Sequence, residues 1–206
     1  MQPFRYLPLA GILILVAIVF VWRPWLQRQR HGSWGIVVFK GSAAQNARDA
    51  MLVVLPLLLI GQAVVAAWWP QALPLSEADL RDTPVIRIAL GALLLFGGLL
   101  LQAAAMLDLG ASWRIGIEEQ ARPGLVTGGL YRFSRNPIFL ALIAVLAGYT
   151  LLLPTLLSAL ILLGAVFAIR QQISEEERYL LRTYGEAYRA YARRVGRLLP
   201  GIGKLH

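Results

Sequence analysis

Long apolar runs alternate with short polar, turn-forming segments along the chain. Residues 7–21, 50–69 and 85–106 form three such runs, each close to the ~20 residues with which a helix crosses the hydrocarbon of a bilayer. A fourth run, residues 138–169, is too long for one crossing and short for two, and Pro154 lies in its middle. Because proline breaks or bends a helix, we predict a tight hairpin of two short helices there.

The polar tail after this hairpin has a helical pattern of its own. Tyr184, Tyr188 and Tyr191 fall on one helix face among many arginines, and Gly185 marks a break. We interpret the tail as two short amphipathic helices that lie along the membrane surface. The complete pattern predicts an all-α, polytopic membrane helix bundle with about five transmembrane helices, including the C-terminal hairpin, and with interfacial C-terminal helices.

Composition supports a membrane location and excludes several chemistries. The 206 residues are 58% hydrophobic with a mean hydropathy of +0.62, which is more apolar surface than one soluble core can bury. The chain lacks cysteine, which excludes disulfides, thiolate metal sites and cysteine nucleophiles. His31 and His206 are the two histidines and lie far apart in sequence, so we expect no metal site.

The charges predict how the spans are oriented. The first run could be a cleaved signal peptide, but only Arg5 precedes it and no small-residue cleavage site follows, so we expect an uncleaved helix. Of the 20 Lys and Arg, 17 lie between the first two runs, after the third run or after the hairpin. Five crossings, with the N-terminus outside and the C-terminus in the cytoplasm, place all three groups on the cytoplasmic side.

This distribution also bears on partners and location. The net charge of +9 reflects topology and attraction to anionic lipid, and we expect no nucleic-acid partner. The cysteine-free, Arg- and Leu-rich composition favours an integral protein of a bacterial inner membrane. Trp113 and Arg114 follow the third run, and we expect the indole ring to lie among the lipid head groups.

The most polar and turn-rich stretch between apolar runs is residues 123–140. Its glycines let backbone amides come close to a ligand. The ring of Tyr131 offers a face for a sulfonium ion or an adenine, and the fork of Arg135 suits a carboxylate. Asn136 and Pro137 are typical of a helix start, with Asn136 as the N-cap. Helix capping alone would also explain this Asn-Pro pair.

Three adjacent carboxylates, Glu175, Glu176 and Glu177, follow the hairpin. Helical neighbours are about 100° apart, so at most two of them point back into the bundle. A buried one needs a partner such as Arg135, or an amine or ribose hydroxyl of a ligand. We interpret Glu175 as part of a solvated face, and Glu177, with Glu176, as inward-facing.

These motifs resemble those of the isoprenylcysteine carboxyl methyltransferase and phospholipid methyltransferase superfamily of integral-membrane enzymes. The resemblance spans residues 109–200, under half of the chain, and has two motifs on either side of the hairpin. The matching residues are Leu125, Val126, Thr127, Gly129, Tyr131, Arg135, Asn136, Pro137 and Phe139 in the first motif, and Glu176, Glu177, Leu180, Tyr184, Gly185, Tyr188, Tyr191 and Pro200 in the second.

The resemblance implies S-adenosylmethionine as methyl donor, held between the C-terminal helices and closed in by the tail. It implies one integrated domain with an N-terminal three-helix membrane region, 1–108, and a methyltransferase-like cofactor-binding region, 109–206. The positions expected to bind the cofactor are Pro123, Gly124, Leu125, Val126, Tyr131, Arg135, Asn136, Pro137, Ile138, Phe139, Glu176 and Glu177. The acceptor would be hydrophobic or lipid-like, for example the carboxylate of a prenyl-cysteine-like substrate.

Two departures from the family pattern concern the chemistry. Many members have histidine where this chain has Asn136, which forms hydrogen bonds but cannot act as a base. Carboxyl methyltransferases tend to have arginine where this chain has Gln172, with Arg170 close by; these two are the candidate substrate-binding residues. The sequence identifies no catalytic residue. An NADPH-dependent membrane reductase of related architecture, or a non-catalytic membrane scaffold, stays open as an alternative.

Overall fold

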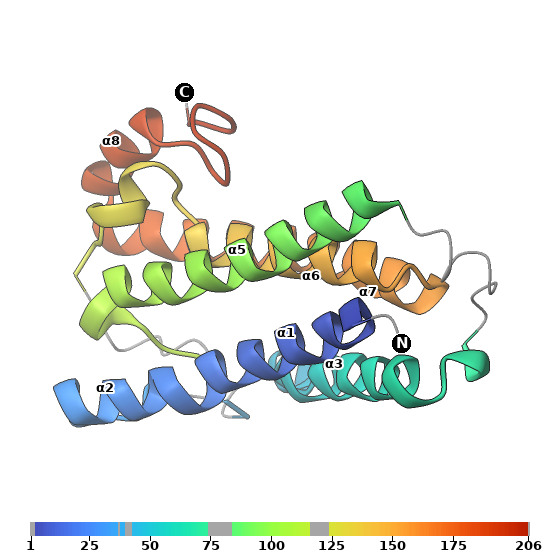
Figure 1. The fold of residues 1–206 in the computed structure, drawn as a ribbon. Helices are drawn as coiled ribbons and strands as arrows, with labels where there is room; N and C mark the ends of the chain where they lie inside the picture. Colours follow the sequence, from blue (N-terminus) through green and yellow to red (C-terminus); the bar gives the residue numbers. More distant parts are fainter. Residues whose placement is uncertain (1–2, 37, 40–42, 74–83, 116–123, 206) are drawn as a thin grey trace.

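The structure is a computed structural model that describes residues 3–36, 38–39, 43–73, 84–115 and 124–205. Within these ranges the regular secondary structure is helical, apart from two isolated bridges. Long helices lie side by side as a bundle, and the C-terminal segment packs against one end of it (Figure 1). Among the described residues, four helices are long and apolar enough to cross a membrane, and a fifth apolar helix is shorter. The all-α polytopic bundle predicted from the pattern is therefore confirmed.

The first span is longer than the apolar pattern indicates. Helix α1 (Leu7–Val16) continues through a π-helical stretch (Ala17–Trp22) into α2 (Arg23–His31), so that one rod extends past the predicted end at residue 21. Pro24 lies inside this continuous rod, just after the π-helical stretch, and its missing N–H removes one hydrogen bond of the rod. Helix α3 (Ala43–Trp68) continues through Pro56 and lies beside α1.

The C-terminal half contains α5 (Val85–Leu109), α6 (Pro137–Leu152), α7 (Leu156–Tyr184) and α8 (Glu186–Arg194). The predicted hairpin is α6 and α7, which are joined at Pro154. Thr155 starts α7 with a capping box, because its hydroxyl accepts from the backbone of Ser158 while Ser158 accepts from the backbone of Thr155.

Two details of this prediction were wrong. Helix α7 is not short, because it continues past its apolar part through Arg170 and the three glutamates to Tyr184. The first of the two predicted tail helices is therefore the polar end of α7, and only α8 is separate. Gly185 does mark the break, with a φ of +52° that favours glycine.

Glycines set the closest contact of the bundle, which is between α5 and α6. A Cβ built on Gly148 would lie 2.6 Å from the carbonyl oxygen of Gly91 and 2.8 Å from the Cα of Leu95, so the two backbones touch there. Gly98 faces Val145 in the same way one helical repeat further along. Small residues at these positions let membrane helices pack without side chains between them.

A buried polar cluster links α3 to the hairpin near the turn between α6 and α7, at the end of the bundle that we call the far end. The Tyr149 hydroxyl donates to the carbonyl of Leu59 at 2.7 Å and lies 3.2 Å from Oε1 of Gln62. The Gln62 amide in turn bonds the hydroxyl of Thr155. Because backbone and side-chain polar groups in a bilayer need partners within the protein, this cluster fixes α3 against α6 and α7.

We predict that Gly148→Ala destabilises the protein by about 1–3 kcal/mol, because the added methyl group overpacks the α5–α6 contact. Gly97→Ala is the matched control, since a Cβ at Gly97 meets nothing within 4 Å, and alanine favours a helix over glycine by up to about 1 kcal/mol. Thermal unfolding in detergent should show a lower midpoint for the first variant and an equal or higher one for the second. Equal midpoints for Gly148→Ala and the parent would contradict the close contact.

Candidate functional site

Five elements meet at one end of the bundle, which we call the site end. They are α2, the last turns of α5, the first turn of α6, the polar part of α7 (Arg170–Tyr184) and α8 with the tail after it (Figure 1). Both sequence motifs lie here. The segment from Gly124 to Asn136 faces α7 and α8 across this end, so motifs separated by a long hairpin in sequence are neighbours in space.

The Arg135 guanidinium is the centre of the site end, and its side chain is 1% exposed. Its Nε and Nη2 donate to Oε1 of Glu177 at 3.1 and 2.6 Å. Its Nη1 donates to the carbonyls of Ala192 and Val195 at 2.9 and 2.6 Å, and Nη2 also reaches the carbonyl of Gly203 at 3.0 Å. All five N–H donors of the guanidinium thus have an acceptor. The partner of Glu177 considered in the sequence analysis is confirmed.

Arg197 pairs with the same carboxylate from the tail. Its Nη2 lies 2.6 Å from Oε2 of Glu177 and its Nε 3.3 Å from Oε1. The Arg197 side chain is 42% exposed, whereas that of Glu177 is 7% exposed. Both carboxylate oxygens of Glu177 are therefore bonded to arginines. We call Arg135, Glu177 and Arg197 the clamp, because together they hold the tail against α6 and α7.

Backbone contacts extend the clamp along the tail. The N–H of Arg135 donates to the carbonyl of Gly196 at 2.9 Å, and the amide of Asn136 donates to the carbonyl of Arg197 at 2.9 Å. Asn136 occupies the N-cap position of α6, but its side chain does not cap the helix. The prediction of a capping side chain was wrong: Nδ2 of Asn136 bonds the tail carbonyl, and the side-chain oxygen accepts no hydrogen bond from the first turn of α6.

Tyrosines of α8 pack beneath this backbone. Tyr188 and Tyr191 are buried together with their rings edge to face, and Leu125 packs against them. The Tyr191 hydroxyl donates to the carbonyl of Tyr131 at 2.7 Å. Burial raises the pKa of Tyr191 to about 12 and that of Tyr188 further, so both hydroxyls stay protonated. The apolar face of α8 is therefore packed against the rest of the protein.

Asp108 is a site residue that the sequence analysis missed. Its carboxylate accepts from the N–H of Leu130 at 2.7 Å, and it lies where a side chain at Gly129 would be. Gly129 has a φ of +55°, so both conformation and space require glycine there. The signal in the sequence was a lone acid at the end of an apolar run. Asp108 thus fixes the turn that presents Tyr131.

Glu176 differs from Glu177 in its surroundings. It is partly buried, and its Oε1 accepts from the amide of Gln172 at 2.9 Å. Burial raises the pKa of Glu176, an effect that the hydrogen bond from Gln172 opposes. Burial also raises the pKa of Tyr131, and the nearby carboxylates of Glu176 and Asp108 add to this. Tyr131 therefore lies near two carboxylates on an acidic side of the site end.

The other predicted site residues have separate places. Pro137 is buried at the start of α6, whereas Val126, Ile138 and Phe139 are partly buried and Gly124 is exposed. Arg170 is exposed and lies with Phe167, Ser174, Glu175 and Arg178 on an outward patch of α7. Pro123 lies outside the described residues. The structure thus unites Tyr131, Arg135, Asn136, Glu176 and Glu177, and leaves Arg170 apart.

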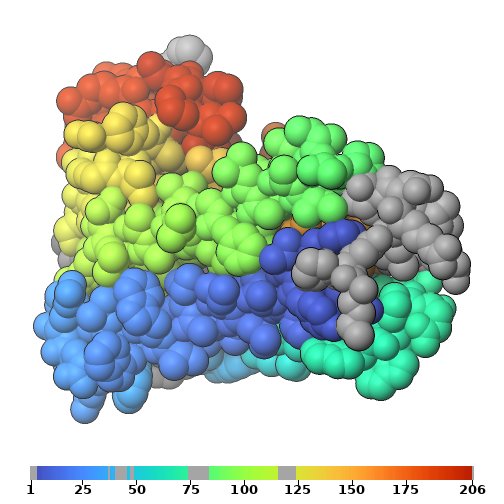
Figure 2. Space-filling model, viewed as in Figure 1, coloured from blue at the N-terminus to red at the C-terminus, as the bar shows by residue number. Residues whose placement is uncertain are grey.

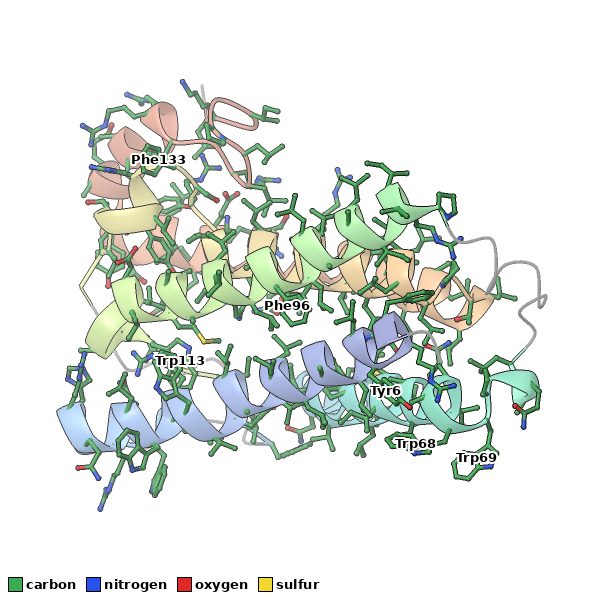
Figure 3. The ribbon with its side chains drawn as sticks, in the orientation of Figure 1. Tyr6, Trp68, Trp69, Phe96, Trp113 and Phe133 are labelled. Atoms are coloured by element: carbon green, nitrogen blue, oxygen red, sulfur yellow. The ribbon has the colours of Figure 1, made fainter. Side chains whose placement is uncertain are left out.

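A second buried arginine joins the first span to the site end. Arg23 donates to the carbonyls of Met106 and Gly110 at 3.1 and 2.6 Å, at the end of α5. Its guanidinium lies 4.7 Å from the ring centroid of Trp113, between α2 and α5 (Figure 3). Trp113 is 2% exposed, so the prediction of a ring among head groups was wrong. The sequence analysis counted Arg23 as a topological charge and missed this contact.

We predict that Arg135→Lys loosens the tail more than Arg197→Lys does. Lysine has three donors against five, so the first variant leaves buried carbonyls unbonded at about 1–3 kcal/mol each. The half-exposed Arg197 can be replaced by another cation that still reaches Glu177. Hydrogen–deuterium exchange of residues 186–205 should accelerate by roughly tenfold or more in the first variant and less in the second. Equal protection in both would contradict the clamp.

Comparison with known proteins agrees with this arrangement. Residues 86–187 match the model of the phospholipid methyltransferase family, from the start of α5 into α8. No curated protein matches the chain. The matched segment includes Asp108, Tyr131, Arg135 and both inward-facing glutamates. The chain belongs to the isoprenylcysteine carboxyl methyltransferase and phospholipid methyltransferase superfamily of membrane proteins.

Proposed function

We propose that the protein transfers a methyl group from S-adenosylmethionine to a hydrophobic or lipid-like acceptor at the cytoplasmic face of its membrane. The acidic surroundings of Tyr131 carry this proposal. S-adenosylmethionine has a sulfonium and an ammonium, and an aromatic face with carboxylates beside it attracts such cations. Ribose hydroxyls also donate well to carboxylates. The cofactor would lie along the segment 124–131, in the 109–206 region.

The two glutamates have different roles in this proposal. Glu177 has both oxygens bonded to arginines, so it acts by holding the tail closed. Glu176 has one oxygen bonded to Gln172 and the other without a hydrogen bond among the described contacts, and it takes the direct contact with the donor. The side-chain donors of Arg135 and Asn136 are already bonded within the protein. These residues and Pro137 therefore shape the cofactor site and do not bond the cofactor through their side chains.

The same charges bear on the acceptor. Arg135 and Arg197 are both engaged by Glu177, and Gln172 is engaged by Glu176. The two arginines of the clamp are therefore already paired and are not free to bind the carboxylate of a prenyl-cysteine. A lipid amine fits the acidic surroundings better.

The main chemical task of the protein is to align the acceptor atom with the methyl group of the donor. The acceptor atom attacks the methyl carbon in line, the carbon–sulfur bond breaks, and its electron pair stays on sulfur, leaving S-adenosylhomocysteine. Holding the two reactants in contact and excluding water supplies much of the acceleration of such a step. Asn136 cannot act as a base, and the three clamp residues are bonded to one another, so we assign a positioning role to all four.

We expect the detergent-solubilised protein to bind S-adenosylhomocysteine saturably in calorimetric titration and not to bind NADPH. NADPH should not bind, because its phosphates require basic and not acidic surroundings. Binding of NADPH alone would instead indicate a membrane reductase. Binding of neither ligand by a folded sample would favour a non-catalytic scaffold. A screen of methyl acceptors should then include both a lipid amine and a prenyl-cysteine carboxylate.

Conservative variants test the division between the glutamates. A hydrogen bond to a charged group contributes about 1.5–3 kcal/mol, so Glu176→Gln should lower the affinity for S-adenosylhomocysteine by roughly 10–100-fold. The tail should stay protected from hydrogen exchange in this variant. Glu177→Gln should weaken binding and accelerate tail exchange together. Glu175→Gln, on the outward patch, is the matched control and should bind as the parent does. Loss of tail protection in Glu176→Gln would contradict the separate roles.

A further inference from the structure

The tail after α8 folds into a closed turn. The N–H of Arg197 donates to the carbonyl of Ile202 at 2.8 Å, and that of Ile202 donates to the carbonyl of Leu199 at 3.1 Å. Gly201 and Gly203 have φ values of +80° and +72°, which glycine adopts without strain. The N–H of Leu205 then returns to the carbonyl of Ala192 at 3.1 Å. The turn is therefore fixed at both ends.

This turn presents apolar residues outward. We call residues 199–202 (Leu-Pro-Gly-Ile) the tail tip. Ile202 is 64% exposed and Leu199 is 47% exposed, while Pro200 is exposed beside them. Fully burying a side chain such as Ile or Leu is worth about 1.5–3 kcal/mol, so a fixed turn that exposes two of them favours an apolar contact. The apolar face of α8 is already buried within the protein and cannot supply that contact.

The position of the tail tip indicates which surroundings it meets. In Figure 1 the tail loop lies on the side of α8 that faces the middle of the bundle, level with the first turns of α6 rather than beyond the helix ends. In Figure 2 the C-terminal segment stands out from α5 and forms a step beside the apolar helices. The tip therefore extends along the bundle toward the depth at which lipid surrounds the spans.

The charged residues nearest the tip in sequence are basic, because the sequence from 187 to 206 contains no acidic residue. Arg193 pairs with Glu186 and Arg197 with Glu177, whereas Arg194 and Lys204 are exposed and have no ion pair among the described contacts. Apolar side chains with a basic border are typical of segments that lie at the boundary between head groups and acyl chains. Basic residues near an anionic leaflet contribute about 1 kcal/mol each.

We propose that the tail tip inserts into the head-group and acyl-chain boundary of the bilayer, with anionic head groups bound by the basic residues around it. Arg135 also bonds the carbonyl of Gly203, next to the tip. Seating of the tip in the leaflet therefore supports the clamp, and the membrane itself helps to hold the tail over the site end. This inference does not depend on which reaction the protein performs.

The chain has no cysteine, so a single introduced cysteine can be labelled without background. We would label Ile202→Cys with an environment-sensitive fluorophore in nanodiscs, with or without lipids that carry a quenching nitroxide near the top of the acyl chain. Leu199→Cys serves as a second probe of the tip. Glu186→Cys is the control, because Glu186 is an exposed acid at the opposite end of α8.

Both tip probes should show blue-shifted emission and lose it when the nitroxide lipid is present, whereas the control should keep its emission. The loss should be larger with anionic than with zwitterionic lipid. Quenching of the tip probes no greater than that of the control would overturn the proposal. Blue-shifted emission without lipid quenching would also overturn it, because protein would then cover the tip. Unchanged thermal unfolding of each labelled variant shows that the fold is intact.

Discussion

The buried guanidinium of Arg135 determines the arrangement of the whole site end. It lies where α6, α7 and the tail meet, and its five donors bond Glu177 on α7, two carbonyls at the end of α8 and one carbonyl of the tail. Removing one partner of a buried ion pair costs about 3–5 kcal/mol, because the other charge is left without compensation. The tail is thus held by the same interaction that keeps Glu177 in the bundle.

The same physical device occurs at the other side of this end. Arg23 lies at the carbonyls that end α5, as Arg135 lies at the carbonyls that end α8. A cation at a helix C-terminus satisfies unpaired carbonyls and the helix dipole together. Asp108 lies in the last turn of α5, between the two residues whose carbonyls Arg23 bonds, and it fixes the turn before Tyr131. The first span, outside the family match, therefore supports the candidate cofactor segment through α5.

The lengths of the apolar runs and the positions of helix-breaking residues made most of the fold predictable. The spans follow from apolar length, and the hairpin from Pro154, because these signals are local. The Arg135–Glu177 pair was also predictable, because buried side chains of opposite charge in a membrane protein require partners within the protein. The role of Arg197 was not predictable, because its pairing with Glu177 depends on how the tail folds back. Arg23 was misassigned because a count of charges does not show which charged side chains are buried. Trp113 was misassigned for a related reason, since its burial depends on the contact with Arg23.

The hydrogen exchange of the full chain in nanodiscs, with and without S-adenosylhomocysteine, tests the central claim most directly. If the site end holds this cofactor beneath the tail, exchange should slow in the segment 124–131 and in residues 192–205 together, with the far end of the bundle unchanged. Saturating ligand that slows exchange at neither segment, or protects only the far end near Gln62, would contradict the account.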